Sequence, residues 1–406
     1  MDVAAIVNEL MGPKGCRDPY PLYEQLRAFG PTVQSDEYMV LVTGHQEADE
    51  IFRNPAFGVI EPELAAQFEP DFPDHPGKNL LGDSILERNA PDHPRMRSLI
   101  SSVFTPRRVS ALAPAVTAAV EQLLDELAAR SEHGDGPVDF LDAFAFRLPI
   151  GVICELLGVP DRDRHLFRPL ASDLTATMEF LVGDEELAAA DRAAGELSQY
   201  FAELAALRRA DPKDDLVSAL VATADADQQR LSDTELLANL VLLLVAGFET
   251  TGNLLGNALA LLFEHPDTAA QLREGTLDPA ALVDEVLRFD SPVQLTSRIA
   301  LTDGLTVGGK PVPRYTGTLL LVGAANRDPR RFPDPNRFDP SRTDGRPLSF
   351  GGGPHYCLGA QLARLEATTA LPALLRRFPA LAPAGPAVHR DRLVLRGYRT
   401  LPVTLG

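Results

Sequence analysis

A glycine-rich segment with one cysteine holds the residues of this chain whose types and spacing could do chemistry. It reads Phe350-Gly351-Gly352-Gly353-Pro354-His355-Tyr356-Cys357-Leu358-Gly359, and a helix-like run follows over 360–366. The glycines let the backbone approach a flat ligand closely. Cys357 falls at the start of the expected helix, where unpaired N–H groups and the positive dipole end favour a thiolate. The pattern therefore predicts that Cys357 is a metal ligand.

Three other interpretations of Cys357 are available from its residue type. A single cysteine is often a small buried hydrophobe, but this glycine-rich context is not typical of one. A catalytic nucleophile with His355 as its base is a second interpretation, and no oxyanion or nucleophile-elbow motif accompanies the pair. A zinc site would need further Cys or His residues at ligand spacing, and there are none.

The segment closely resembles the haem-binding signature of the cytochrome P450 superfamily, Phe-Gly-x-Gly-x-His-x-Cys-x-Gly. Every fixed position is matched between Phe350 and Gly359. The resemblance implies a cytochrome P450 fold, mainly α with small β-sheets, and makes Cys357 the axial thiolate ligand of haem b. It also implies that the other signature residues bind the cofactor, namely Phe350, Gly351, His355 and Gly359.

A second match is Ala246-Gly247-Phe248-Glu249-Thr250-Thr251, within a long apolar helix. Small or polar residues at helical spacing could simply allow close helix packing. However, a buried acid is costly unless it is hydrated, neutral or paired, which argues for a watery cavity. The resemblance implies that Ala246 lies at the cofactor, that Glu249 relays protons, and that Thr250 forms a hydrogen bond to the peroxo species.

A third match is an acid–base pair, Glu285 and Arg288, three residues apart on a predicted helix. Such a pair is most often a solvated surface pair. The resemblance instead implies a buried structural ion network that includes Arg337 from the proline-rich segment and holds the coil that positions Cys357.

The two haem carboxylates need cations or hydrogen-bond donors. The resemblance assigns His93 and Arg97, four residues apart on one helical face, together with Arg298 and His355. Each of these residues alone would be interpreted as ordinary surface charge, but all four stand at matching positions.

These matches imply a haem-thiolate monooxygenase of the bacterial type, which inserts one atom of O2 into a C–H or C=C bond. Electrons would come from NAD(P)H through a ferredoxin or flavodoxin and its reductase, because no dinucleotide fingerprint or iron–sulfur cysteine cluster is present. Two alternatives are a non-oxygenating enzyme that couples C–C or C–O bonds and a haem-binding sensor or carrier. A sensor would not need Glu249 and Thr250.

A run without acids, residues 93–108, carries four arginines on an acidic chain: Arg95, Arg97, Arg107 and Arg108. Such an island would steer an acidic redox protein. We therefore expect docking at Arg107 and Arg108, with Arg364 as a further contact.

The substrate pocket is expected, by resemblance, to be lined mostly by apolar residues. The candidates are Met178, Glu179, Phe180, Val293, Leu295 and Val394. Such a pocket suits a hydrophobic secondary metabolite, which could be a polyketide or macrolide, a terpenoid or a cyclic peptide. Glu179 would contact a basic group such as an amino sugar.

The elements that must position these residues are mostly helices. Apolar periodicity predicts helices over 109–130, 184–209 and 236–264, the last being the oxygen-activating helix at about 234–264. Ser232 and Glu235 have the spacing of a capping box. Strands are expected over 38–42, 305–307, 318–322 and 392–403, and a proline-rich coil over 326–353.

Composition sets the class of protein. The 406 residues are 45% hydrophobic and carry 38 Lys+Arg against 57 Asp+Glu, a net charge of −19, which disfavours nucleic acid as a partner. Three cysteines at unrelated spacings indicate a reducing cytoplasm. The N-terminus lacks the pattern of a secretory signal, and Glu249 interrupts the most apolar segment, so we expect no membrane anchor. Without repeats or linkers, residues 1–406 are expected to form a single domain.

Overall fold

The computed structural model describes residues 1–36, 38–132, 136–226 and 231–406. It is mainly helical with small sheets, as predicted. The chain divides into two compact units, one of residues 1–58, 116–148 and 250–406, and the other of residues 59–115 and 149–249. The boundary between Glu249 and Thr250 lies within one continuous helix, α14 (Asp233–Glu264). A single domain over the whole chain stays a prediction.

The first unit contains every strand that the described residues form. The strands are β1 (Thr32–Asp36), β2 (Met39–Val42), β3 (Phe57–Gly58), β4 (Val138–Asp139), β5 (Thr296–Ala300), β6 (Leu305–Val307), β7 (Lys310–Val312), β8 (Gly317–Leu320), β9 (Ala382–Pro383), β10 (Val388–His389), β11 (Tyr398–Thr400) and β12 (Pro402–Thr404). Its helical segments are α1 (Val3–Met11), α2 (Pro13–Arg17), α3 (Tyr20–Arg27), α4 (His45–Arg53), most of α9 (Ala113–Glu132), η2 (Leu141–Ala145), α15 (Pro266–Glu274), α16 (Pro279–Phe289), α17 (Val322–Ala325), η5 (Gly353–His355) and α18 (Ala360–Arg377).

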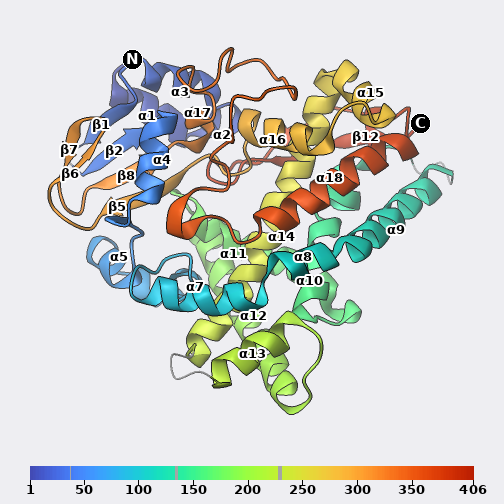
Figure 1. Ribbon diagram of the computed structural model, residues 1–406, viewed down its shortest axis with the longest axis horizontal. Coiled ribbons are helices and arrows are strands. Elements are labelled where there is room, and N and C mark those ends of the chain that lie inside the picture. Colours follow the sequence, from blue (N-terminus) through green and yellow to red (C-terminus); the bar gives the residue numbers. More distant parts are fainter. Residues whose placement is uncertain (37, 133–135, 227–230) are drawn as a thin grey trace. The chain divides into compact units, whose positions relative to one another are not determined.

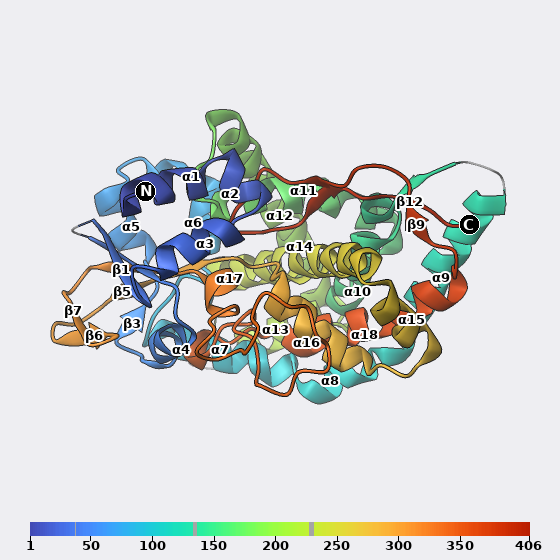
Figure 2. The same ribbon diagram turned by 90° about the horizontal axis from the view of Figure 1, so that it is seen from above.

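The main sheet of the first unit has the strand order β1-β2-β8-β5-β3. Strand β2 is parallel to β8, and the other pairs are antiparallel. Figure 1 shows this sheet beside α1, α3 and α4, and Figure 2 shows β9 and β12 side by side near the C-terminus. Buried residues of β2, β8 and α4, including Val42, Leu320, Ile51 and Phe52, form one core. This core holds the C-terminal end of α4, against which the cysteine loop packs.

The second unit is helical. It contains α5 (Pro62–Phe68), η1 (Phe72–Asp74), α6 (Pro76–Gly82), α7 (Asp92–Val103), α8 (Pro106–Ala111), most of α10 (Arg147–Leu157), η3 (Asp161–Leu166), α11 (Phe167–Leu174), η4 (Thr175–Met178), α12 (Asp184–Ala210) and α13 (Leu216–Ala226). The long α12 packs against α6, α11 and α13. Its Ala-rich face, including Ala190, Ala193 and Ala194, is buried.

Local sequence signals account for several boundaries. Ser232 Oγ accepts a hydrogen bond from the Glu235 backbone N–H at 3.1 Å, and the Glu235 carboxylate accepts one from the Ser232 N–H at 2.8 Å, which confirms the capping box. The helix predicted over 109–130 is divided between α8 and α9. Pro114 explains this break, because proline fits the first turn of a helix but not its interior.

The strand predicted over 392–403 is only partly correct. Strands form at its C-terminal end, as β11 and β12. Upstream, Leu395 pairs with Val293 in an isolated bridge. The continuous apolar run at 393–395 is typical of a buried strand, but the described chain makes only this short contact there.

Helix α14 is the one described helix that is long and apolar enough to cross a membrane by length and composition. Two thirds of its most apolar window is buried inside the structure, 67%, which is typical of a core helix. Small residues allow close packing along it: a Cβ at Gly252 would lie 2.3 Å from the Phe146 ring. Gly252 therefore allows close packing of the helix against Phe146, which is the interpretation of small residues on this helix that does not require a ligand.

Candidate functional site

The cysteine loop is closed by its own backbone. The Cys357 N–H donates to the Phe350 carbonyl at 2.9 Å, and the Tyr356 N–H donates to the Gly353 carbonyl at 3.1 Å. Helix α18 begins at Ala360, with Gly359 at its N-cap. Cys357 is thus held just before the N-terminal end of an 18-residue helix, where the dipole favours the thiolate over the thiol.

Two glycines of this loop have a left-handed backbone, Gly351 at φ 68° and Gly353 at φ 62°. A Cβ at Gly353 would lie 2.0 Å from the Phe52 carbonyl oxygen at the end of α4. Backbone cannot move aside as a flexible side chain can, so Gly353 is required both by its φ and by this close approach. The loop that presents Cys357 is therefore packed directly against α4.

The other two cysteines have different surroundings. Cys154 is fully buried in α10, and burial raises the pKa of its thiol to about 12. A buried neutral thiol of this kind is chemically inert. Cys16 is half-buried in the short helix α2. Cys357 is half-buried like Cys16, but of the three cysteines only Cys357 lies beside the N-terminus of a long helix.

Arg298 on β5 is a buried cation. It is 8% exposed, and its Nη1 donates to the Ser297 carbonyl at 2.7 Å. Burial lowers the pKa of its guanidinium to about 10. Among the described residues, no carboxylate forms an ion pair with it. A buried arginine normally requires an anion, so this residue fits the carboxylate of a bound cofactor, as the sequence predicts for haem.

Helix α14 has one uncovered strip in the middle of its buried length. Between residues 238 and 262, the positions that are not buried are Leu243, Ala246, Gly247 and Thr250. Their spacing of three and four places them on one helical face. Glu249, next to Thr250, is only 1% exposed. Apart from Leu243, the strip therefore presents two small residues and one hydroxyl, which suits the close approach of a flat group.

The donor set of the first unit fits the haem that the sequence predicts. Cys357 would supply the axial thiolate and Arg298 a carboxylate partner. His355 lies in η5, two residues before the cysteine. The Cys357 thiolate is a soft ligand that suits iron, and the Arg298 guanidinium is a cation that suits a propionate.

The remaining predicted carboxylate partners lie on α7 of the second unit. His93 is 4% exposed and Arg97 is half-buried, and the two residues lie one helical turn apart.

The basic island at residues 93–108 is partly neutralised by acids that lie outside it in the sequence. Arg95 pairs with Glu235 and with Asp92, and Arg108 on α8 pairs with Asp214 at 3.1 Å. Arg107 is exposed and has no ion-pair partner among the described residues.

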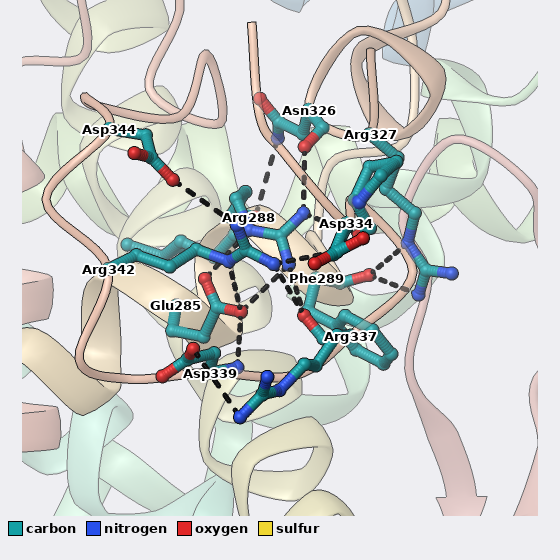
Figure 3. A network of polar contacts seen from close by, with 12 residues as sticks. Glu285, Arg288, Phe289, Asn326, Arg327, Asp334, Arg337, Asp339, Arg342 and Asp344 are labelled. Carbon is teal, nitrogen blue, oxygen red and sulfur yellow. Dashed lines mark hydrogen bonds and ion pairs between the residues drawn. The ribbon is translucent and has the colours of Figure 1, made fainter. Parts of the chain in front are cut away.

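Glu285 and Arg288 form a buried ion pair on α16. Arg288 donates to the two Glu285 carboxylate oxygens through Nε and Nη2, each at 2.7 Å, and the two side chains are 2% and 3% exposed. Arg288 also donates to the carbonyls of Asn326, Pro335 and Arg337 at 3.1, 2.8 and 3.0 Å (Figure 3). The pair therefore ties α16 to the proline-rich coil, as predicted.

The predicted contribution of Arg337 to this network is corrected. Its side chain is 71% exposed and approaches Asp339 at 3.9 Å, so only its backbone carbonyl joins the network. The arginine of the coil that reaches Glu285 is Arg342, whose Nε lies 3.3 Å from the Glu285 carboxylate and whose side chain is 11% exposed. Arg342 also donates to the carbonyls of Pro333 and Asp334 (Figure 3). Which arginine of the coil turns inward depends on the path of the coil, which the sequence pattern does not show.

Asn326 is a further positioning residue that sequence reasoning missed. It is fully buried, and its Oδ1 accepts from the Leu348 N–H at 2.7 Å while its Nδ2 donates to Ser349 Oγ at 2.9 Å. These bonds hold the backbone just before Phe350. The only signal in the sequence was a polar residue after an apolar run, at the start of the coil.

Arg364 on α18 lies in the same region as the signature. Its guanidinium stacks over the Phe350 ring at 5.0 Å and pairs with Asp284 on α16. The charge of Arg364 is therefore partly neutralised within the chain, and the residue also packs on the loop.

The predicted pocket residues fall into two groups. Met178 ends η4, Glu179 follows as its C-cap, and Phe180 is 46% exposed in the connection to α12. In the first unit, Val293 pairs with Leu395, Leu295 is fully buried, and Val394 is 9% exposed. The structure thus brings Val293 beside the segment of Val394, while contact with a substrate stays a prediction.

Comparison with known proteins gives consistent results. A model of the family described as Cytochrome P450 matches residues 177–277 and 280–393. The chain is 40% identical over 406 residues to 6-deoxyerythronolide B hydroxylase of Saccharopolyspora erythraea, covering 96% of each chain. It is 38% identical over 401 residues to the cytochrome P450 monooxygenase PikC of Streptomyces venezuelae, covering 97% of this chain and 92% of that protein. Its structure resembles ligand-free CYP164A2 of Mycobacterium smegmatis with a TM-score of 0.88 and 37% identity, covering 98% and 99%.

Proposed function

Because the chain belongs to the cytochrome P450 family, we propose that it is a tailoring enzyme whose substrate is a hydrophobic secondary metabolite. The protein is a monooxygenase, an oxidoreductase that inserts one atom of O2 into its substrate. One relative with near-complete coverage, 6-deoxyerythronolide B hydroxylase, and one similar solved structure, the polyketide synthase cytochrome P450 PksS, support the choice of a polyketide or macrolide over a terpenoid or cyclic peptide.

The haem, when bound, supplies the activation of O2, and its thiolate ligand donates the electron density that favours O–O cleavage. Cys357 would be that ligand. Arg298 and His355 would hold the propionates. The same role for His93 and Arg97 stays a prediction from the sequence resemblance. The buried cation of Arg298 is the observation on which this assignment rests most directly.

One observation supports the oxygenase function most directly. Thr250 lies on the uncovered strip of α14, and the preceding residue, Glu249, is buried. The Thr250 hydroxyl can therefore form a hydrogen bond to a ligand on this face. The Glu249 carboxyl can pass protons to the site from inside the fold, where bulk water is excluded. A haem protein that only carried or sensed a ligand would not need this pair.

Labelled dioxygen tests this function. With a macrolactone substrate, NADPH and surrogate redox proteins, we expect one 18O atom from 18O2 in the product, detected by mass spectrometry. A product that is oxidised but unlabelled would contradict the proposal and support C–C or C–O coupling. A protein that binds haem but forms no product from any of the substrate classes would support the sensor or carrier alternative.

Thr250→Ala is expected to uncouple electron consumption from product formation. Without the hydroxyl, proton delivery is misdirected and hydrogen peroxide is released. We expect product per NADPH to fall about tenfold, equivalent to about 1.4 kcal/mol in relative barrier heights. The measurement compares peroxide with product at equal NADPH consumption. Thr251→Ala is the matched control, because Thr251 is buried, 2% exposed. Equal coupling in Thr250→Ala and the native protein would refute the assignment.

Electron delivery is proposed to come from a ferredoxin or flavodoxin and its reductase, in the cytoplasm. Members of this family are reduced by partner proteins, and an acidic partner would be attracted to exposed arginines. The structure favours Arg107 over Arg108, because Arg108 already pairs with Asp214. Arg364, paired with Asp284, is expected to contribute least.

The double substitution Arg107→Glu and Arg108→Glu is expected to slow reduction by ferredoxin about tenfold or more at low salt, and less at 0.15 M salt, where exposed charges are screened. Stopped-flow reduction measures this rate. Arg162→Glu, at a side chain that is 84% exposed on η3, controls for a charge reversal at another exposed site, with half of the change in net charge. An unchanged reduction rate at low salt would exclude docking at this site.

A further inference from the structure

A short contact joins two segments that are far apart in the sequence. The Gln294 N–H donates to the Val394 carbonyl at 2.9 Å, and the Arg396 N–H donates to the Pro292 carbonyl at 2.8 Å. Val293 and Leu395 are therefore a directly opposed, non-hydrogen-bonded antiparallel pair. Side chains of such a pair lie close together on one face. Val293 is a predicted substrate contact, and Leu395 directly follows Val394, which is another.

A buried polar cluster lies behind this pair. Side chains alternate between the two faces of paired segments, so Gln294 and Arg396 point to the face opposite Val293 and Leu395. There, Arg396 Nε donates to Asp290 Oδ1 at 2.8 Å, and the Tyr20 hydroxyl donates to the same oxygen at 2.8 Å. Gln294 Nε2 donates to the Tyr20 oxygen at 3.0 Å. Each of the two segments thus sends one side chain into one hydrogen-bonded cluster.

The cluster is also attached to the N-terminal part of the chain. Arg396 Nη1 donates to the carbonyls of Cys16 and Arg17, each at 3.0 Å, at the end of α2. Tyr20 is the first residue of α3, and the Arg327 guanidinium lies 3.5 Å from the centre of its ring. The position of the two paired segments is therefore set by elements from three parts of the sequence.

The charges of the cluster are matched. Although burial by itself raises the pKa of Asp290, the charge of Arg396 and the hydrogen bonds from Arg396 and Tyr20 hold this pKa below its ordinary value. The side chains of Arg396 and Asp290 are 7% and 10% exposed. A largely buried ion pair has few alternative geometries, because separation would leave a charge without a partner. Two backbone hydrogen bonds alone give a pair of segments little stability.

We propose that Tyr20, Asp290 and Arg396 are positioning residues that set the location of the Val293–Leu395 pair and thereby the selectivity of the enzyme for its ligands. None of the three is proposed to touch the substrate. The inference rests on the proposed function, because that function makes the Val293–Leu395 pair part of the substrate site. A merely structural cluster would affect stability without changing ligand selectivity.

Tyr20→Phe tests the proposal in the haem-bound full-length protein. This substitution removes the hydroxyl that bridges Asp290 and Gln294 but keeps the ring beneath Arg327. Two probes are titrated by the absorption change on binding: imidazole, which is too small to depend on the pocket wall, and econazole, which fills a pocket. We expect the Kd of econazole to change about fivefold or more and that of imidazole to stay within about twofold.

A second measurement does not depend on ligand binding. Amide hydrogen exchange is expected to become faster in Tyr20→Phe at Gln294 and Arg396, whose N–H groups form the two backbone bonds. Tyr200→Phe is the matched control, because the Tyr200 hydroxyl donates to Asp163 at 3.0 Å in the second unit. It is expected to leave both the azole selectivity and the exchange at Gln294 and Arg396 unchanged.

The outcomes separate this inference from the proposed function. A lowered melting temperature in Tyr20→Phe with an unchanged ratio of azole affinities and unchanged exchange would overturn the positioning role. Arg396→Lys, which keeps the charge but not the forked geometry, should shift the ratio in the same direction as Tyr20→Phe, and an unshifted ratio would also count against the proposal. A native protein without a thiolate-type carbon monoxide spectrum would refute the proposed function, and hydrogen exchange would still decide the positioning role.

Discussion

Cys357→Ser is expected to abolish the strongly red-shifted Soret band of the dithionite-reduced protein under carbon monoxide and to eliminate monooxygenation. Serine keeps the size and the backbone hydrogen bond to Phe350, but its hydroxyl is not a thiolate donor. Losing a partner that only orients a metal ligand typically costs about 10–100-fold in activity. Losing the ligand itself should cost more, so turnover should fall to background. The spectrum and the rate are measured on the same preparation.

Cys16→Ser is the matched control, because Cys16 is also half-buried but lies in the short helix α2. It is expected to leave the red-shifted band intact. A red-shifted band in Cys357→Ser would mean that another residue supplies the thiolate, and the assignment of the cysteine loop would then be wrong. Loss of the band in both variants would indicate a general loss of haem binding rather than loss of the ligand.

The largest expected effect on stability comes from Arg288→Met. Removal of this guanidinium leaves the Glu285 carboxylate buried, with Arg342 at 3.3 Å as its remaining cation among the described residues. It also removes the Arg288 hydrogen bonds to three backbone carbonyls of the coil. Breaking a buried ion pair by removing one partner costs about 3–5 kcal/mol. We expect a loss of that size in the free energy of unfolding, measured with urea, together with weaker haem retention because the coil leads into the cysteine loop.

Arg337→Met provides the sharpest comparison. The sequence predicts a buried role for this arginine, whereas its side chain is 71% exposed in the structure. Exposed substitutions of this kind usually change stability by no more than about 0.5 kcal/mol. A small effect at Arg337 with a large effect at Arg288 would support the observed arrangement. Losses of equal size would show that Arg337 acts in the buried network after all.

Features that depend on neighbouring residues were predictable from the sequence. The capping box formed because Ser232 and Glu235 are three residues apart, and each can reach the other's backbone only in a helix start. The hairpin strands β6 and β7 formed around Gly308 and Gly309, where the left-handed turn favours glycine. The proline-rich coil stayed free of long regular elements because proline lacks the N–H that helices and ladders use.

Contacts between distant segments were less predictable. Arg337 and Arg342 lie five residues apart in the same coil, and periodicity cannot assign an inward direction to either in an irregular chain. The basic island at 93–108 contained no acid in sequence, yet Glu235 and Asp214 neutralise part of it after folding. The cluster of Tyr20, Asp290 and Arg396 joins residues up to 376 positions apart (396 − 20), and no local pattern indicated it.

The sequence by itself determined the chemistry of this protein: a cysteine in a glycine loop before a helix, an acid and an alcohol on an apolar helix, and a cation at each matching position. These features depend on residue type and short spacing, which the chain carries before it folds. Only the tertiary structure decided which cations are buried with no carboxylate partner among the residues that it describes, as at Arg298, and which are already paired, as at Arg108. The reason is physical, because burial and electrostatic pairing arise from groups that are brought together in space, and the strength of both depends on the exclusion of water around them.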